Sequence, residues 1–255
     1  MTEDRQQYPL FPFLFRSLIS IIYCGMIMAL QKGDFIKISY TGRLEDGKIF
    51  DTTDEETAKA NNIYDERGLY GGDVIVIGGG HTITGLDEDF VGKEAGYETE
   101  LTIPTEKAFG SPKAELVTSV SVSKFKEGKA AVGQVVEQDG RHGVVTKVIG
   151  RRATIDFNSP LAGKTVIYKY RIDEVITETA EKVKALFAYY TGVRDAEVVI
   201  DGTIARVSVP LQISFNQNWF LSKMKMARDL TENTELTEVW FVEKFPKITP
   251  EEKKE

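Results

Sequence analysis

Alternating apolar and polar residues predict β-strands in the first half of the chain. Ile36, Ile38 and Tyr40 alternate with polar neighbours, which is the period of a half-buried strand. Residues 74–77 are all apolar and precede three glycines, so a buried strand is expected to end there. Residues 99–103 alternate again and run up to a proline. Tyr40 is therefore expected on the apolar face of the first strand.

One short helix is expected beside these strands. Ile83, Leu86 and Phe90 have helical spacing, and the acidic residues that follow Leu86 suit a helix N-terminus. An Asp-Gly turn precedes Phe50, which places Asp51 at the edge of a core. The prediction for this region is a largely antiparallel sheet packed on one short helix.

The middle of the chain has a different pattern. Between residues 112 and 157, four short β-rich runs are separated by turn residues. These runs are residues 117–122, 135–138, 144–149 and 153–157. One more strand is expected at residues 166–175, after this stretch.

From residue 177 onward the pattern is helix, two strands, helix, strand. The apolar stripe of the first helix consists of Val183, Leu186, Phe187 and Tyr190. An Asp-Gly pair predicts a hairpin between the two strands that follow. The apolar face predicted for the second helix consists of Phe220, Met224 and Ala227.

Composition is that of an ordinary globular protein. With 255 residues, 42% of them hydrophobic and 28% charged, the chain can bury a sizeable core in two or three domains. A net charge of -7 argues against a nucleic-acid-binding surface, because such surfaces need clustered Lys and Arg. The single cysteine, Cys24, favours a reducing compartment. His81 and His142 are expected to be solvated loop residues, so neither a metal nor a cofactor is predicted.

The N-terminus allows two interpretations. Residues 10–30 are almost entirely apolar and about long enough to cross a bilayer. Pro12 and Arg16 interrupt this run, and the residues before it lack the basic cluster of a secretory signal. The favoured interpretation is an extension of a cytoplasmic protein, and the alternative is a membrane anchor.

Five motifs, in this order, resemble the site segments of FKBP-type peptidyl-prolyl cis-trans isomerases. They are ISYTG at residues 38–42, FDTT at 50–53, ITGLDE at 83–88, KAFG at 107–110 and DFNSPLAGK at 156–164. The resemblance implies a long archaeal form of this family. In that form, an insert-in-flap domain associated with binding unfolded polypeptide interrupts the isomerase domain, and an extra C-terminal domain follows.

The expected fold class is α+β. It consists of an antiparallel FKBP-type half-barrel sheet around a short helix, an all-β insert and a C-terminal αββαβ domain. The predicted units are an apolar extension at residues 1–28, an isomerase domain at 29–111 that resumes at 158–176, an insert at 112–157, a C-terminal domain at 177–248 and a charged tail at 249–255.

The resemblance also implies the site residues. The residues expected to line the pocket are Tyr40, Phe50, Asp51, Ile83, Leu86, Phe109 and Tyr168, with Tyr70, Val76, Thr82 and Leu161 as weaker candidates. Phe50, Leu86 and Tyr168 would contact the prolyl ring, while the Ile83 N–H would bind a substrate carbonyl. Leu86 and Phe109 stand where the small forms have an indole and a tyrosine. Asp73 is an unexpected charge beside the pocket, with two open interpretations: it lowers activity, or the loop shifts Tyr70 into the vacant place.

The predicted function is isomerisation of X-Pro bonds in folding polypeptides, combined with chaperone activity. No covalent intermediate is needed, because rotation about an amide neither makes nor breaks a covalent bond. The alternative is a non-catalytic holdase or assembly module with a degenerate pocket. A third interpretation, a membrane-tethered folding factor, depends on residues 10–30 alone. The predicted partners are unfolded or partly folded chains, and the sequence indicates no oligomeric state.

Overall fold

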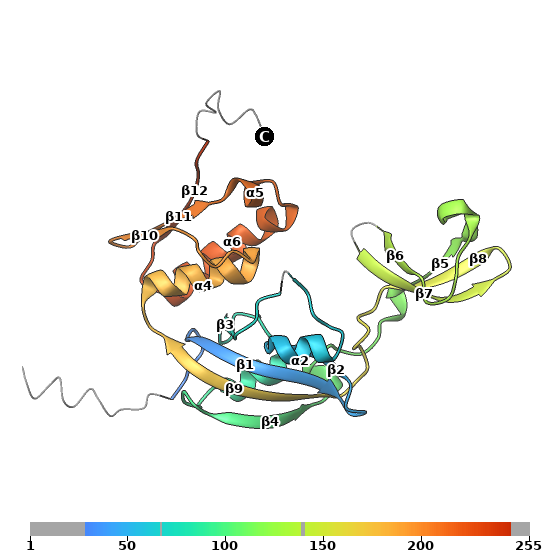
Figure 1. Ribbon diagram of the computed structural model, residues 1–255, viewed down its shortest axis with the longest axis horizontal. Helices are drawn as coiled ribbons and strands as arrows, with labels where there is room; N and C mark the ends of the chain where they lie inside the picture. The colour runs from blue at the N-terminus through green and yellow to red at the C-terminus, as the bar shows by residue number, and fades with distance from the viewer. Residues whose placement is uncertain (1–28, 67, 139–140, 246–255) are drawn as a thin grey trace, which may run out of the picture.

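A computed structural model describes residues 29–66, 68–138 and 141–245 of the chain, and within these ranges it forms three β-sheets (Figure 1). The predicted extension at 1–28 and the predicted tail at 249–255 lie outside the described residues. Among the helices that are described, none is long and apolar enough to cross a membrane.

The first sheet is antiparallel throughout and has the order β2-β1-β9-β4, with β3 also paired to β1. Its strands are β1 (Phe35–Leu44), β2 (Ile49–Thr52), β3 (Asp73–Val76), β4 (Glu98–Ile103) and β9 (Val166–Ile176). β9 follows the whole length of β1, whereas β2 and β3 share the opposite edge of β1. The first and last parts of this sheet are therefore far apart in the sequence.

A short helix packs on this sheet, as predicted. In α3 (Thr84–Phe90), Leu86 and Phe90 are buried, and the Phe90 ring lies 5.0 Å from the ring of Tyr170 on β9. A second short helix, α2 (Glu55–Ala60), was not predicted. It begins after Asp54, whose side chain accepts a hydrogen bond from the N–H of Thr57 at 2.8 Å.

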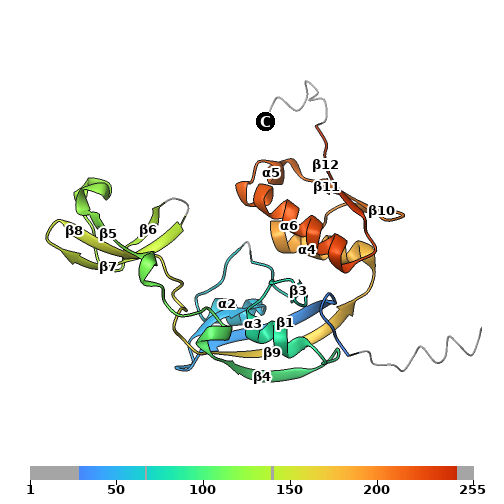
Figure 2. The same cartoon turned by 180° about the vertical axis from the view of Figure 1, so that it is seen from behind.

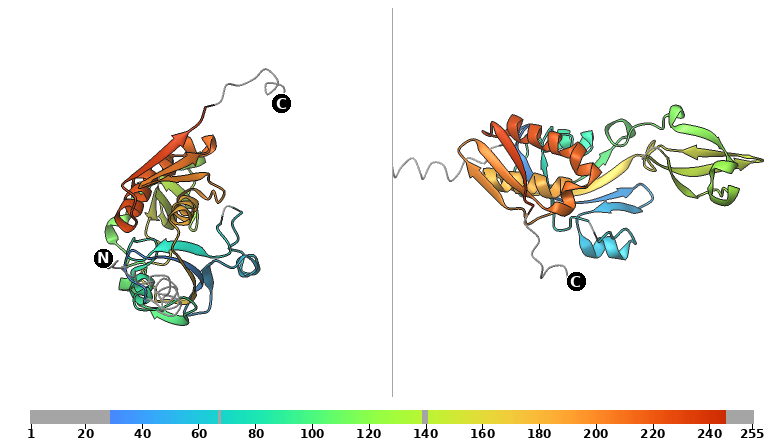
Figure 3. Two further views of the ribbon diagram at one scale, coloured as in Figure 1. Left: turned by 90° about the vertical axis from the view of Figure 1, so that its left-hand side faces the viewer. Right: turned by 90° about the horizontal axis from the view of Figure 1, so that it is seen from above.

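The second sheet lies between β4 and β9 in the sequence and projects away from the rest of the molecule (Figure 3). Its strand order is β5-β8-β7-β6. The strands are β5 (Val117–Ser121), β6 (Val135–Gln138), β7 (Arg141–Ile149) and β8 (Arg152–Asp156). Single 3-10 turns accompany it as η2 (Ala114–Leu116), η3 (Val122–Lys124) and η4 (Lys126–Gly128), whereas η1 (Thr105–Lys107) directly follows β4 of the first sheet. The fully buried core of this sheet is small and consists of Val145, Ala153 and Ile155.

The third sheet has the order β10-β11-β12, and β12 runs parallel to β11. The elements of this region are α4 (Thr179–Thr191), β10 (Val198–Asp201), β11 (Ile204–Val209), α5 (Leu211–Ser214), α6 (Gln217–Asn233) and β12 (Glu238–Glu243). Apart from the one-turn helix α5, this is the predicted αββαβ order. The predicted fold class is confirmed.

The predicted apolar stripe is right for α4 and wrong for α6. Val183, Leu186 and Phe187 of α4 are buried. In α6, however, Phe220 is 65% exposed and Met224 is 77% exposed. The buried face of α6 instead consists of Trp219, Met226, Asp229 and Leu230. It is set by packing, because the Trp219 ring lies 5.3 Å from Phe187 of α4 and 5.0 Å from Phe241 of β12.

The first and third sheets share a hydrophobic core. Phe35 of β1 and Val76 of β3 are completely buried in one cluster with Val183 and Phe187 of α4 and with Leu230 of α6. Figure 2 shows α4 between α6 and β3. Burial of this common apolar surface fixes the C-terminal domain against the first sheet.

Candidate functional site

The candidate site lies where β2 and β3 separate along the edge of β1. β3 pairs with residues 35–38 and β2 with residues 41–43, so Tyr40 falls between the two strands. The backbone of Tyr40 is paired instead with Thr53, whose hydroxyl accepts from the Tyr40 N–H at 2.9 Å and whose N–H donates to the Tyr40 carbonyl at 3.0 Å. The segment between β2 and β3 therefore leaves the sheet beside Tyr40.

Four aromatic side chains meet at this opening and form what we call the aromatic cluster: Tyr40, Phe50, Phe109 and Tyr168. The Phe50 ring lies 5.7 Å from the ring of Tyr168 and 6.1 Å from the ring of Phe109, both edge-to-face. The Tyr40 and Tyr168 rings are 5.7 Å apart. Gly42 permits this packing, since a Cβ atom there would approach both Phe50 and Tyr168 to 2.9 Å.

Beside the aromatic cluster is a hollow of about 310 Å³, which we call the central hollow. Its lining includes Tyr40, Phe50, Asp51, Tyr70, Asp73 and Tyr189. Three carboxylates, those of Asp51, Asp65 and Asp73, thus share the hollow with four aromatic side chains. The Tyr40 hydroxyl donates a hydrogen bond to Asp73 Oδ2 at 3.1 Å.

Burial dominates the ionisation of this hollow. It raises the pKa of Asp51 and of Asp73 above the ordinary range of aspartate, against the opposing effect of the Tyr40 hydroxyl on both. Each carboxylate also raises the pKa of Tyr40, although burial is the larger cause. At neutral pH, Tyr40 is therefore a hydrogen-bond donor, and the negative charge on each aspartate is stabilised less well than in water.

We expect Asp73→Asn to raise the thermal midpoint at pH 7. The amide oxygen of asparagine can still accept from Tyr40, and the side chain has no charge to bury. Because the pKa of Asp73 is raised in the folded state, its contribution to stability is fully present below the unfolded pKa, near 3.9, and is lost as pH rises through the folded pKa. The advantage of Asp73→Asn should therefore disappear by about pH 4 in melting curves recorded across this pH range.

The matched control is Asp201→Asn, because Asp201 is exposed in the β10–β11 hairpin and pairs only with the exposed Arg206. This variant should show no gain at pH 7. A gain for Asp73→Asn that is equally large at pH 4 would contradict the assignment to a buried charge.

Two further predicted residues, at the start of α3, belong to the same hydrophobic core as the aromatic cluster. Ile83 precedes the first residue of this helix in an extended conformation and packs, half-buried, on the same core as Leu86. Within the described part of the chain, the N–H of Ile83 donates to no other group. Leu86 is 1% exposed and lies in the core against which Tyr40, Phe50 and Phe109 pack. A backbone N–H without a partner in the protein is suited to binding a carbonyl.

The weaker candidates are placed differently from one another. Tyr70 lines the central hollow, and its ring stacks on Tyr64 at 5.4 Å. Thr82 is half-buried next to Ile83, and Leu161 is half-buried in the connection between β8 and β9. Val76 is completely buried in the core shared with α4 and α6, so the structure does not bring it to the hollow.

Sequence reasoning missed two residues near the site. Tyr189 lines the central hollow, although it belongs to α4. The prediction that His81 is a solvated loop residue is wrong, because its side chain has no exposed surface. His81 Nε2 lies 3.0 Å from Asp229 Oδ2 of α6, across the junction of the two domains. His142 is exposed, as predicted, but it lies in strand β7 and not in a loop.

Comparisons with known proteins match two parts of the chain to two families. Residues 28–161 match the family described as FKBP-type peptidyl-prolyl cis-trans isomerase, and residues 179–246 match a second family, FKBP26_C-terminal. The chain is 33% identical over 152 residues to a short-type peptidyl-prolyl cis-trans isomerase of Methanocaldococcus jannaschii, covering 59% of this chain and 96% of that protein.

Two bacterial relatives match a similar share of this chain. An FKBP-type 16 kDa peptidyl-prolyl cis-trans isomerase of Escherichia coli is 25% identical, over 59% of this chain and 96% of the relative. The FKBP-type isomerase SlyD of Treponema pallidum is 30% identical, over 59% of this chain and 81% of the relative. With a family match across more than half of its length, the chain belongs to the FKBP-type peptidyl-prolyl cis-trans isomerases.

Proposed function

We propose that the aromatic cluster and the central hollow together form the site at which this isomerase rotates X-Pro bonds. Rotation must overcome the partial double-bond character of the amide, a barrier of about 18–20 kcal/mol. The reaction needs no nucleophile and no proton transfer, since no covalent bond changes. The site has only to bind the twisted amide better than either planar form.

The observation that carries this proposal is the meeting of the Phe50, Phe109 and Tyr168 rings, on the same hydrophobic core against which Ile83 packs. The prolyl ring would pack on Phe50 and Tyr168, above the buried Leu86. The rings would shield the bound amide from water, which favours the twisted form because its charge separation is smaller than that of the planar form. The Ile83 N–H would donate to a substrate carbonyl and fix the chain on one side of the rotating bond.

Asp51 has a distinct role in this proposal. It follows Phe50 directly on β2 and is held at the edge of the central hollow, where burial raises its pKa. A partly desolvated carboxylate interacts strongly with the dipole of a nearby amide. We infer that Asp51 acts on the amide while it twists.

We expect Asp51→Ala to lower kcat/KM on short X-Pro peptides by about tenfold, which corresponds to about 1.4 kcal/mol of transition-state stabilisation. A protease-free isomerisation assay measures this directly. The fold should be retained, because alanine removes a buried charge and opens no apolar core. Asp201→Ala, an exposed site in the β10–β11 hairpin, should leave kcat/KM unchanged. Equal activity in both variants would remove Asp51 from the mechanism.

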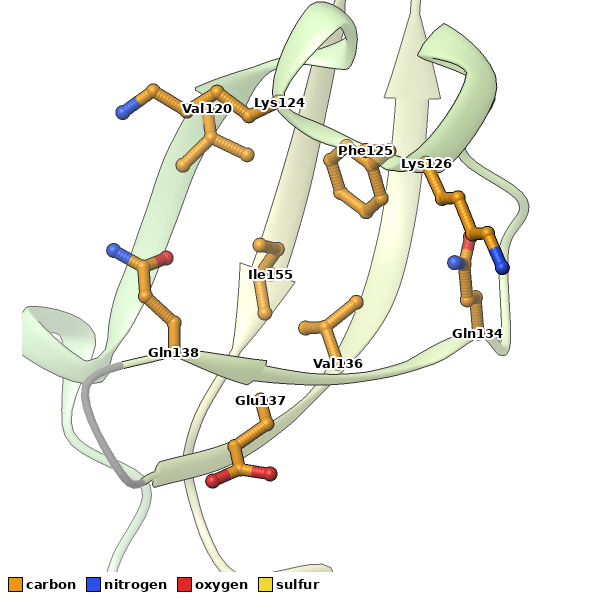
Figure 4. Close-up of a pocket in the computed structure, with 9 residues that line it drawn as sticks. All are labelled: Val120, Lys124, Phe125, Lys126, Gln134, Val136, Glu137, Gln138 and Ile155. Carbon is orange, nitrogen blue, oxygen red and sulfur yellow. The ribbon is translucent and has the colours of Figure 1, made fainter.

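The insert supports a second part of the function, binding of non-native chains. It has a hollow of about 450 Å³, into which the apolar side chains of Val120, Phe125, Val136 and Ile155 point, while the Glu137 carboxylate points away (Figure 4). β5 and β6 are edge strands, whose unpaired backbone groups can pair with an extended segment. We infer that residues 112–157 act as a polypeptide-binding domain, separate from the isomerase domain at 29–111 and 158–176.

A cytoplasmic location is part of the proposal. One cysteine in 255 residues fits a reducing compartment. Residues 10–30, on which the membrane-anchored alternative depends, lie almost wholly outside the described part of the chain. Recovery of the full-length protein in a membrane fraction that resists carbonate washing would support that alternative instead.

The rival function, a holdase with a degenerate pocket, is favoured by one observation. The Tyr40 hydroxyl donates its proton to Asp73, so this proton is directed at a side chain of the protein and not at a substrate. The isomerisation assay on the unmodified protein decides between the two. Turnover of an X-Pro peptide supports the enzyme, whereas suppression of aggregation without turnover supports the holdase.

A further inference from the structure

Two successive tyrosines of α4 face different surroundings. Tyr189 lines the central hollow together with Tyr40 and Asp73. Tyr190 instead donates to Asp229 Oδ2 of α6 at 2.9 Å. The C-terminal domain therefore supplies one wall of the hollow through a single side chain, while the neighbouring tyrosine binds within the junction of the domains.

Tyr189 is held in place from several directions. Its hydroxyl donates to the carbonyl oxygen of His81 at 3.0 Å, and its ring centre lies 4.9 Å from that of the His81 ring. Helix α4 itself is anchored in the core that it shares with Phe35 and Val76. A wall that is ordered before the substrate binds lowers the entropy lost on binding.

His81 connects this wall to the segment that carries Ile83. The Val76 N–H donates to His81 Nδ1 at 3.0 Å, so the proton of the neutral ring is on Nε2, which donates to Asp229 Oδ2 at 3.0 Å. Tyr190 donates to the same carboxylate oxygen. These bonds tie the residues just before Ile83 to the C-terminal domain.

The chemistry of the hollow favours a positively charged guest. Tyr40, Tyr70 and Tyr189 contribute aromatic rings to the lining, and Asp51, Asp65 and Asp73 contribute carboxylates. Among the residues that the structure describes, the cation that acts on Asp73 is Arg194, which is exposed and donates to the Tyr70 carbonyl oxygen. A Lys or Arg side chain in the hollow would gain cation–π contacts and the attraction of these carboxylates. A Glu side chain would be repelled.

We propose that Tyr189 is a substrate-contacting, specificity-determining residue, which together with Asp73 selects X-Pro segments in which X is basic over those in which X is acidic. The proposal rests on the proposed site, because the prolyl ring in the aromatic cluster is what brings the neighbouring residue to the central hollow. It assigns part of the pocket to the C-terminal domain.

The test compares kcat/KM on three peptides that differ only in X, as Lys, Leu or Glu. The full-length protein should turn over the Lys peptide faster than the Glu peptide. Tyr189→Leu should lower the Lys-to-Glu ratio by about threefold to tenfold, the range given by one partly exposed cation–π contact. Tyr189→Phe retains the ring and should keep the ratio. Asp73→Asn should lower it.

The matched control is Tyr190→Phe, which alters the same helix and the same junction but not the lining of the hollow. It should leave the ratio unchanged. Damage to the fold lowers all three rates together, whereas a changed ratio reports contact with the substrate. Should Tyr189→Leu fail to fold, Tyr189→Arg gives the same readout, because a positive charge there should shift the preference toward Glu.

The proposal is overturned if folded Tyr189→Leu keeps the unmodified Lys-to-Glu ratio. Where Tyr189→Leu does not fold, an unchanged ratio in Tyr189→Arg has the same meaning. An equal change of the ratio in Tyr190→Phe would also overturn the proposal. Phe50→Ala separates this failure from failure of the proposed site. If Phe50→Ala loses turnover of all three peptides while the Tyr189 variants keep the ratio, only the role of Tyr189 is wrong. If Phe50→Ala is fully active, the site itself is misplaced.

Discussion

Replacing Phe50 with alanine is expected to lower kcat/KM for every short X-Pro peptide by about tenfold to a hundredfold. The Phe50 ring contacts both Phe109 and Tyr168 and, like Tyr40, belongs to both the aromatic cluster and the central hollow. Its removal opens the prolyl site to water and takes away a wall of the pocket. The corresponding loss of transition-state stabilisation is about 1.4–2.8 kcal/mol. A protease-free assay and a melting curve on the same preparation provide the measurement.

Phe220→Ala is the matched control, since it makes the same substitution on the exposed face of α6. It should keep both the activity and the thermal midpoint. Phe50 is half-buried, so its replacement also costs some stability, and assays are therefore run well below the lower midpoint. Undiminished turnover in folded Phe50→Ala would show that the prolyl ring binds elsewhere.

Local periodicity predicted the elements of this protein well, because most of them bury one face. In β1, Ile36 and Ile38 are buried in the core of the first sheet. Phe35, on the opposite face, is also completely buried, because α4 and α6 cover the start of the strand. The alternation of apolar and polar residues predicts burial of the face that carries Ile36 and Ile38. It does not predict burial of Phe35, because that depends on a domain that begins about 140 residues later.

The error on α6 has the same origin. Two apolar stripes exist on this helix, one through Phe220 and Met224 and one through Trp219, Met226 and Leu230. Spacing alone does not choose between them. The second stripe is buried because Phe187 and Phe241 provide complementary rings on either side of Trp219.

The site was predictable only where its residues lie in family motifs. Tyr40, Phe50 and Tyr168 belong to motifs or to the strand that follows one, and the structure brings them together. Tyr189 and His81 were missed because their contacts join residues 108 positions apart and arise only when the domains pack. The one available signal was Asp73, a charge directly before the apolar residues 74–77.

Removing the insert is expected to affect protein substrates far more than peptides. Lys113 and Asn158 face each other at its base, because the Lys113 N–H donates to Asn158 Oδ1 at 2.8 Å and the Asn158 amide donates to the Lys113 carbonyl at 3.1 Å. A short Gly-Ser loop between these two residues replaces residues 114–157 without stretching the first sheet. Peptide turnover should stay within about threefold of the full-length value, since the peptide needs only the pocket.

Proline-limited refolding of a whole protein should slow by about tenfold or more, because a tethered second site raises the concentration of the refolding chain near the pocket. Suppression of aggregation should fall with it. Val136→Asp keeps the insert but places a charge in its hollow, and it should reproduce the loss on protein substrates alone. Glu137→Gln, whose side chain points away from that hollow, is the matched control and should behave as the unmodified protein (Figure 4). Equal losses on peptide and protein substrates after removal of the insert would mean that it shapes the pocket and binds no client of its own.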